Sequence, residues 1–145
     1  MRVNECMTRD VTMVDPQTTI RDAAKMMADC DAGILPVSED DRLVGMITDR
    51  DIAVRGVAAG KGPEAKVRDI MSAEVRYCFE DDDSKDVLRN MSDLQVRRLP
   101  VLSRSKRLVG IVSLSDLASK GQAPEAGKAL TGIARPGGEH SQALH

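Results

Sequence analysis

Two segments of the chain space their apolar residues as a helix does when it is buried along one side. In the first segment these residues are Ile20, Ala23, Ala24 and Met27. In the second segment they are Val87, Leu88, Met91 and Leu94. The i, i+3, i+4, i+7 spacing predicts an amphipathic helix in each place. Pro16 with Thr18 or Thr19 marks the start of the first helix, and Ser84 marks the start of the second.

Short apolar runs of strand length surround the first of these helices. The run at 11–14 precedes it, and the runs at 34–37 and 43–48 follow it, with a polar turn at 38–42 between them. These runs predict one strand and then a hairpin of two strands. A second helix is expected after Thr48, with an apolar side formed by Ile52, Ala53, Val57 and Ala58. The predicted order is strand, helix, strand, strand, helix.

The same order occurs twice, because the chain repeats itself. The sequence "LPV" at 35–37 recurs at 99–101, which is 64 positions later (35 against 99). The sequence "RLVGMIT" at 42–48 recurs as "RLVGIVS" at 107–113, which is 65 positions later (42 against 107). One residue is therefore inserted in the second turn, at 103–106. Internal repetition of this kind indicates two copies of one structural unit.

The repeat predicts an α+β fold of two tandem β-α-β-β-α units that pack with pseudo-twofold symmetry. We expect residues 1–60 to form the first unit, 61–120 the second, and 121–145 a C-terminal tail with a short helix. The stretch 56–66, rich in Ala and Gly, would connect the units. A unit of roughly 60 residues buries too little surface to be stable alone. Packing two such units together creates two symmetry-related clefts, and ligand sites favour such junctions.

The composition is that of a globular protein with no surplus of charge. Of 145 residues, 41% are hydrophobic and 30% charged, and the net charge is -2, so nothing favours nucleic acid or an anionic membrane as a partner. The chain shows no signal-peptide pattern and no apolar run of spanning length, so we expect a soluble cytoplasmic protein. Its three cysteines form no CxxC pair, which argues for reduced thiols and against structural zinc. Cys30 continues the apolar side of the first helix and is expected in the core.

Each repeat contains the motif Gly-h-h-Ser/Thr-x-x-Asp, in which h is an apolar residue. Its copies are Gly45, Thr48, Asp51 and Gly110, Ser113, Asp116. Glycine in a strand permits close approach of a ligand or of backbone. The hydroxyl would stand at a helix start, where free N–H groups attract anions, and the carboxylate could bind a ribose. The same spacing fits a helix capping box, and the motif alone favours that interpretation.

Three arginines shift the balance toward a nucleotide. Arg50 lies inside the first motif, and Arg97 and Arg98 directly precede the "LPV" strand of the second repeat. A guanidinium at a strand edge can bind two phosphate oxygens at once. Each of these arginines also fits a solvated surface position.

With these motifs the chain resembles the CBS-domain pair, or Bateman module, from Met1 to about Lys120. The elements that carry the resemblance are "CMTRDVTMV", "ILPV", "RLVGMITDRDIAVR", "DIMSAEV", "RRLPV" and "RLVGIVSLSDLA". The resemblance implies adenosine ligands such as AMP, ADP, ATP, NAD or S-adenosylmethionine in the clefts, with no metal and no required cofactor. It also implies a homodimer. We expect the module to act either through an unidentified effector protein or by self-association. The "SLSD" stretch is similar to the nucleotide-binding stretch in the regulatory subunit of AMP-activated protein kinases.

The resemblance implies a role for particular residues in each cleft. In one cleft Asp116 would hold the ribose, and the phosphate would be held by Ser113, Ser115 and Arg98. The adenine of that ligand would lie near Thr12, Gly33 and Ile34. In the symmetry-related cleft Asp51 would hold the ribose, with Thr48 and Arg50 toward the phosphate. There the places of Thr12, Gly33 and Ile34 are taken by Arg76, Arg97 and Arg98, so that cleft is more cationic and the Asp116 cleft is the better adenine site.

The tail at 121–145 matches neither repeat. Pro124 is expected to start a short helix with one apolar side, formed by Ala126, Ala129, Leu130 and Ile133. The alternatives are a loose terminus and a helix that docks on a partner subunit. Both histidines, His140 and His145, lie in this tail, so a catalytic triad is not expected. The predicted function is ligand-dependent regulation without catalysis, and the alternative is a protein-interaction scaffold with empty clefts.

Overall fold

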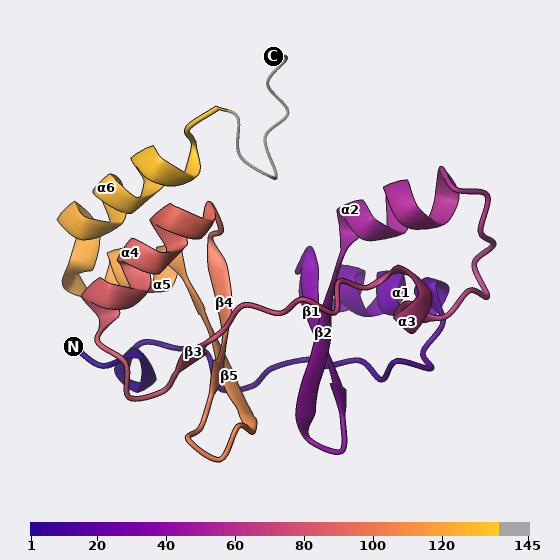
Figure 1. Cartoon of the computed structure of the whole chain (residues 1–145), viewed down its shortest axis with the longest axis horizontal. Coiled ribbons are helices and arrows are strands. Elements are labelled where there is room, and N and C mark those ends of the chain that lie inside the picture. The colour runs from indigo at the N-terminus through magenta and orange to yellow at the C-terminus, as the bar shows by residue number, and fades with distance from the viewer. Residues whose placement is uncertain (137–145) are drawn as a thin grey trace. The chain divides into compact units, whose positions relative to one another are not determined.

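The computed structural model describes residues 1–136, and these form two compact units (Figure 1). The middle unit comprises Thr12–Val75. The terminal unit combines Met1–Val11 with the chain from Arg76 onward. Each unit contains helices and a β-hairpin, so the predicted α+β class with two units is confirmed.

The opening segment of each sequence repeat packs with the hairpin of the other repeat. In the terminal unit, Thr8 N–H donates to Ile111 O (2.8 Å) and Ile111 N–H donates to Thr8 O (2.9 Å). In the middle unit, Met46 and Ser72 exchange the matching pair of backbone hydrogen bonds, both of 2.9 Å. The compact units are therefore not the two halves of the sequence. The ranges 1–60 and 61–120 describe the sequence repeats and remain predictions.

The middle unit is a two-stranded antiparallel hairpin with helices beside it. The hydroxyl of Thr19 caps the first helix by accepting a hydrogen bond from Asp22 N–H (3.2 Å). In place of the strand predicted at 11–14, Val14 alone makes a parallel β-bridge, and its partner is Val37. The helix predicted after Thr48 is one α-turn that continues as a π-helix. The elements are α1 (Ile20–Cys30), β1 (Ile34–Glu39), β2 (Arg42–Thr48), α2 (Asp49–Asp51), η2 (Ile52–Val57) and α3 (Val67–Ile70).

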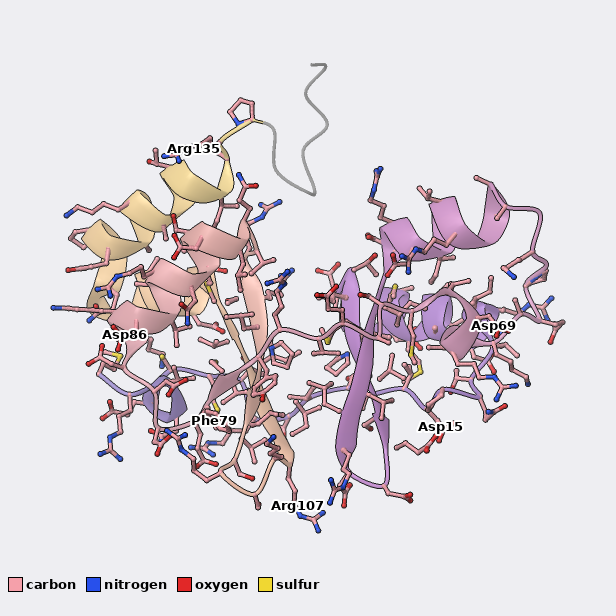
Figure 2. The ribbon with its side chains drawn as sticks, in the orientation of Figure 1. Asp15, Asp69, Phe79, Asp86, Arg107 and Arg135 are labelled. Carbon is pink, nitrogen blue, oxygen red and sulfur yellow. The ribbon has the colours of Figure 1, made fainter. Side chains whose placement is uncertain are left out.

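The terminal unit has a three-stranded sheet in the order β3-β4-β5 and an additional helix. The second helix predicted from the sequence lies in this unit and starts at Ser84, as predicted. Asp83 caps this helix by accepting a hydrogen bond from Lys85 N–H (2.8 Å). Phe79, labelled in Figure 2, ends β3, and the guanidinium carbon of Arg104 lies 4.2 Å from its ring centroid. The elements are η1 (Val3–Glu5), β3 (Cys78–Phe79), α4 (Ser84–Leu94), β4 (Arg98–Leu102), β5 (Leu108–Ser113), α5 (Leu114–Leu117), η3 (Ala118–Gln122) and α6 (Ala123–Ile133).

The predicted helix stripes form the cores of the two units. Seven of the eight residues behave as expected: they are buried or pack against the core, namely Ile20, Ala23, Met27, Val87, Leu88, Met91 and Leu94. Ala24 is exposed. The prediction that Cys30 lies in the core is wrong, because α1 ends there and Asp31 turns the chain in the left-handed conformation (φ 52°). The other two thiols are buried, and burial raises the pKa of Cys6 and raises that of Cys78 to about 12.

The extra residue of the second repeat lies in its hairpin turn, as predicted. In the middle unit, Glu39 pairs with Arg42 across a two-residue loop whose φ angles are both positive (54° and 62°). In the terminal unit, Ser103 N–H donates to Arg107 O (2.9 Å) across a three-residue loop that ends with Lys106 at φ 64°. Two-residue loops with positive φ and three-residue loops that end in a left-handed residue are the two commonest hairpin connections.

The tail forms the predicted short helix, α6, which packs on its own unit (Figure 1). Ala126 and Ala129 are buried, and α6 lies against α4 and α5. The side-chain amide of Gln95 donates two hydrogen bonds, of 3.1 and 2.9 Å, to carbonyl oxygens at the end of α6. The surface on which α6 docks in this structure is therefore α4 of the same chain. Docking of the tail helix on a partner subunit remains a prediction. The last part of the tail, with His140 and His145, lies outside the described residues.

Candidate functional site

The Ser/Thr-x-x-Asp motifs form helix capping boxes in both units. Ser113 Oγ accepts a hydrogen bond from Asp116 N–H (3.0 Å), and Asp116 Oδ2 accepts one from Ser113 N–H (3.1 Å). Thr48 and Asp51 make the same two bonds, each of 2.9 Å. The capping interpretation of the motif is confirmed. It leaves room for a ligand, because a carboxylate has roughly four acceptor positions and the cap uses one of them.

Arg98 stands directly across the terminal hairpin from Ser113. Residues opposed in this way project from the same side of a sheet, with Cβ atoms about 5 Å apart. The Arg98 side chain is exposed, and within residues 1–136 it makes no ion pair or hydrogen bond. Ser115 Oγ lies 3.3 Å from Ser113 Oγ. An unpaired arginine that stands across the hairpin from two neighbouring hydroxyls is an arrangement suited to phosphate.

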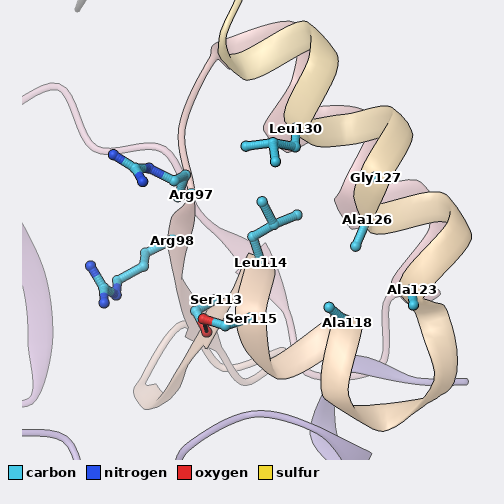
Figure 3. A pocket seen from close by; sticks show the side chains of 10 residues that line it. All are labelled: Arg97, Arg98, Ser113, Leu114, Ser115, Ala118, Ala123, Ala126, Gly127 and Leu130. Carbon is cyan, nitrogen blue, oxygen red and sulfur yellow. Dashed lines mark hydrogen bonds between the residues drawn. The ribbon is translucent and has the colours of Figure 1, made fainter.

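These polar groups line a pocket of about 580 Å³ within the terminal unit (Figure 3). The polar part of its lining consists of Arg97, Arg98, Ser113 and Ser115. The rest of the lining is Leu114, Ala118, Ala123, Ala126, Gly127 and Leu130. Figure 3 shows the two arginines extending from one side of the pocket and α6 forming the other side. The volume lies in the range of sites for small molecules.

The wall formed by α6 is the part of this pocket that the sequence repeat did not predict. Ala123, Ala126, Gly127 and Leu130 lie in the tail, which has no counterpart in the first repeat. The only signal for them was the apolar stripe of the tail helix, which predicted a docking helix but not the surface on which it docks.

The matching place in the middle unit has different chemistry. Ile34 stands across the hairpin from Thr48, where the terminal unit has an arginine across from a serine. A Cβ on Gly33 would lie 2.9 Å from Asp49 Oδ2, so the carboxylate of Asp49 fills the space beside this glycine. Arg50 is exposed. The hairpin of the middle unit therefore offers an apolar residue and an additional carboxylate where the terminal unit offers cations.

The structure divides the predicted ligand residues between the two units. In the terminal unit, residues at the start of α5 are brought together with one on the facing strand, namely Ser113, Ser115, Asp116 and Arg98. The corresponding group at the start of α2 consists of Gly33, Ile34, Thr48, Arg50 and Asp51. Thr12 is exposed and is the first residue of the middle unit. The roles of all these residues toward a ligand remain predictions.

Both motif glycines allow close approach of backbone. A Cβ on Gly110 would lie 2.7 Å from Thr8 O, and one on Gly45 would lie 2.9 Å from Ser72 O. Real Cβ atoms essentially never come this close to another heavy atom. The two glycines are therefore required for the opening segments to pair with the hairpins. Of the two reasons that the sequence offered, a close ligand or close backbone, the structure shows the second.

Two further features, a metal-binding cluster and a membrane-spanning helix, are absent from the described part of the chain. Within residues 1–136, no group of three or more His, Cys, Asp or Glu side chains could hold a metal ion. The same residues contain no helix long and apolar enough to cross a membrane. The two histidines lie beyond this range, and the absence of a metal site from the chain remains a prediction.

Comparison with known proteins identifies both repeats. The family model described as "CBS domain" matches residues 3–56 and 67–122. The chain is 41% identical over 132 residues to the CBS domain-containing protein YhcV of Bacillus subtilis, across 90% of this chain and 94% of that protein.

Two solved structures are similar in fold. One is Hypoxic Response Protein I with two coordinated zinc ions, with a TM-score of 0.75 and 39% identity over 82% of this chain and 98% of that one. The other is the CBS domain pair of protein MJ0100 in complex with 5′-methylthioadenosine and S-adenosyl-L-methionine. Its TM-score is 0.74, with 26% identity over 86% of this chain and 98% of that one.

Proposed function

The chain belongs to the CBS-domain family as a pair of CBS domains, and we propose that it is a regulatory module that binds an adenosine-containing ligand. The ligand class is AMP, ADP, ATP, NAD or S-adenosylmethionine. Binding would favour one conformation or assembly of the module over another, since a ligand shifts an equilibrium by its difference in affinity for the two states. We expect the ligand to be released chemically unchanged, because a sensor binds its ligand without converting it.

The observation that carries this proposal is the cluster at the start of α5. Arg98 lies across the hairpin from Ser113, and the hydroxyl of Ser115 lies 3.3 Å from the hydroxyl of Ser113. All three residues line one pocket. A phosphate at this place would gain a charged donor and two hydroxyl donors. Asp116 follows directly, and its carboxylate keeps acceptor positions for the two hydroxyls of a ribose. Phosphate and ribose would then lie next to each other, as they do in a nucleotide.

The choice of an adenosine-containing ligand over other phosphate compounds is supported by the family. The MJ0100 pair was solved with two ligands that both contain adenosine. For the adenine we keep the predicted contacts Thr12, Gly33 and Ile34. For the second ligand set we keep the predicted roles, with Asp51 toward the ribose and Thr48 and Arg50 toward the phosphate.

Calorimetric titration of the full chain with the five ligands tests the proposal. We expect at least one of them to bind. If that ligand carries phosphate, as AMP, ADP, ATP and NAD do, we expect Arg98→Gln to weaken its binding about ten- to a hundredfold. This range corresponds to one charged hydrogen bond of about 1.5–3 kcal/mol. The matched control is Arg89→Gln, an exposed arginine of α4 paired with Asp86 at 3.6 Å, which should leave the affinity unchanged. If none of the five ligands binds at high micromolar concentration, the adenosine proposal is refuted.

The capping boxes favour a second candidate function, a protein-interaction scaffold with empty clefts. In that case the hydroxyl and carboxylate of each motif serve only the helix start. The melting temperature separates the two candidates, because any ligand that binds the folded chain must raise it. For either candidate we expect a cytoplasmic homodimer that acts on a separate effector protein.

A further inference from the structure

The pocket of the terminal unit extends beyond the groups proposed to hold phosphate. Asp116 is not part of its lining, whereas Ser113 and Ser115 are. A ligand with its ribose at Asp116 would therefore place its phosphates at the end of the pocket that Arg98, Ser113 and Ser115 line. A mononucleotide would leave the rest of the 580 Å³ unfilled.

The unfilled part is apolar and is closed by α6. Among the residues that line the pocket, the only charged ones are Arg97 and Arg98. The other end is lined by Leu114 and Ala118 together with the side of α6 that carries Ala126 and Leu130. Leu130 is 47% exposed although it belongs to the apolar stripe of its helix. An apolar group bound here would cover this leucine, which is favourable in proportion to the apolar area removed from water.

We infer that this site selects adenosine phosphates that carry an apolar group beyond the phosphates. The inference rests on the proposed function, since it takes the orientation of the ligand from the ribose at Asp116 and the phosphates at Arg98. The chemical class includes acyl and alkyl esters of adenosine phosphates and larger carriers built on adenosine diphosphate. Because α6 supplies one wall, such a ligand contacts both the hairpin and the tail helix, whereas AMP would contact only the hairpin end.

Two esters of ADP provide a matched pair of probes, the methyl ester and the hexyl ester of the β-phosphate. They carry the same charge and differ by five methylene groups. We expect the hexyl ester to bind the full chain at least tenfold more tightly, which requires burial of about two of those methylenes. Calorimetric titration gives both affinities.

Two variants test whether α6 provides the selectivity. Leu130→Ser should reduce the advantage of the hexyl ester to about threefold or less and leave the affinity for the methyl ester unchanged. Val57→Ser changes an apolar residue on η2 that is more exposed than Leu130 (70%), and it should preserve the full advantage. Equal affinity of the two esters for the unmodified chain would overturn the inference. An advantage that survives Leu130→Ser would also overturn it, as would binding of ADP without binding of either ester. If neither ADP nor the esters bind, it is the proposed function that fails.

Discussion

Gly110 is a position at which a small substitution should have a large effect on stability. A Cβ added there would lie 2.7 Å from Thr8 O and 2.8 Å from Met7 Sδ. The sulfur belongs to a flexible side chain and can move, but the carbonyl oxygen belongs to backbone. Gly110→Ala must therefore push the opening segment away from β5 and weaken the two hydrogen bonds that join Thr8 to Ile111.

The size of the effect follows from these contacts. Overpacking in a fitted interior costs about 1–3 kcal/mol. Each weakened hydrogen bond adds about 0.5–1.5 kcal/mol at most. We expect the free energy of unfolding to fall by about 2–4 kcal/mol, out of a total of about 5–15 kcal/mol for a typical domain.

Urea unfolding followed by circular dichroism measures this difference. The matched control is Gly127→Ala, the same substitution within α6, where no heavy atom lies within 4 Å of the added Cβ. Alanine is the better helix former, so this variant should be more stable by up to about 1 kcal/mol. The two substitutions thus have opposite expected signs. A Gly110→Ala variant within about 0.5 kcal/mol of the unmodified chain, the range of an ordinary surface substitution, would refute the reasoning.

Two other predictions follow from the same structure. A thiol reagent should modify Cys30 rapidly in the folded chain and the other two cysteines only after unfolding. Burial protects Cys6 and Cys78 from the reagent, and it raises the pKa of Cys78 to about 12. Rapid modification of two thiols per chain would contradict this prediction. Gln95→Ala removes two hydrogen bonds to the end of α6, so amide hydrogen exchange in α6 should accelerate by about five- to a hundredfold, corresponding to about 1–3 kcal/mol. The exchange of α1 in the middle unit serves as the internal control and should not change.

The local elements of the fold could be predicted from the sequence, because local periodicity determines them. Most of the apolar residues predicted for α1 and α4 are buried or pack against the core. The inserted residue lengthens the hairpin turn, at the place where the spacing between matching residues of the two repeats changes from 64 to 65 positions. Cys30 shows the limit of periodicity. It occupies an apolar position of its helix, but the helix ends there, and a residue at a helix end has lost the neighbours that would cover it.

The exchange of opening segments could not be predicted in the same way. The repeat shows that "MT" at 7–8 corresponds to "MS" at 71–72, but two equal segments can each pair with either hairpin without any change in sequence pattern. The glycines at the pairing positions predicted a close approach and did not identify what approaches. The docking surface of α6 was unpredictable for a related reason, since an apolar stripe fits any apolar surface, and here α4 of the same chain supplies it.

The differences between the two repeats also help to separate residues that serve the fold from residues available for a ligand. Gly45 and Gly110 allow the same backbone contact, and Thr48 and Ser113 make the same cap, so these pairs are explained without a ligand. The residue across the hairpin from the cap is different, because it is Ile34 in one unit and Arg98 in the other. The same antiparallel pairing forms with either residue, so the fold does not require the arginine. An exposed arginine that the fold does not need, and that lines the same pocket as two serine hydroxyls, supports the proposed anionic ligand.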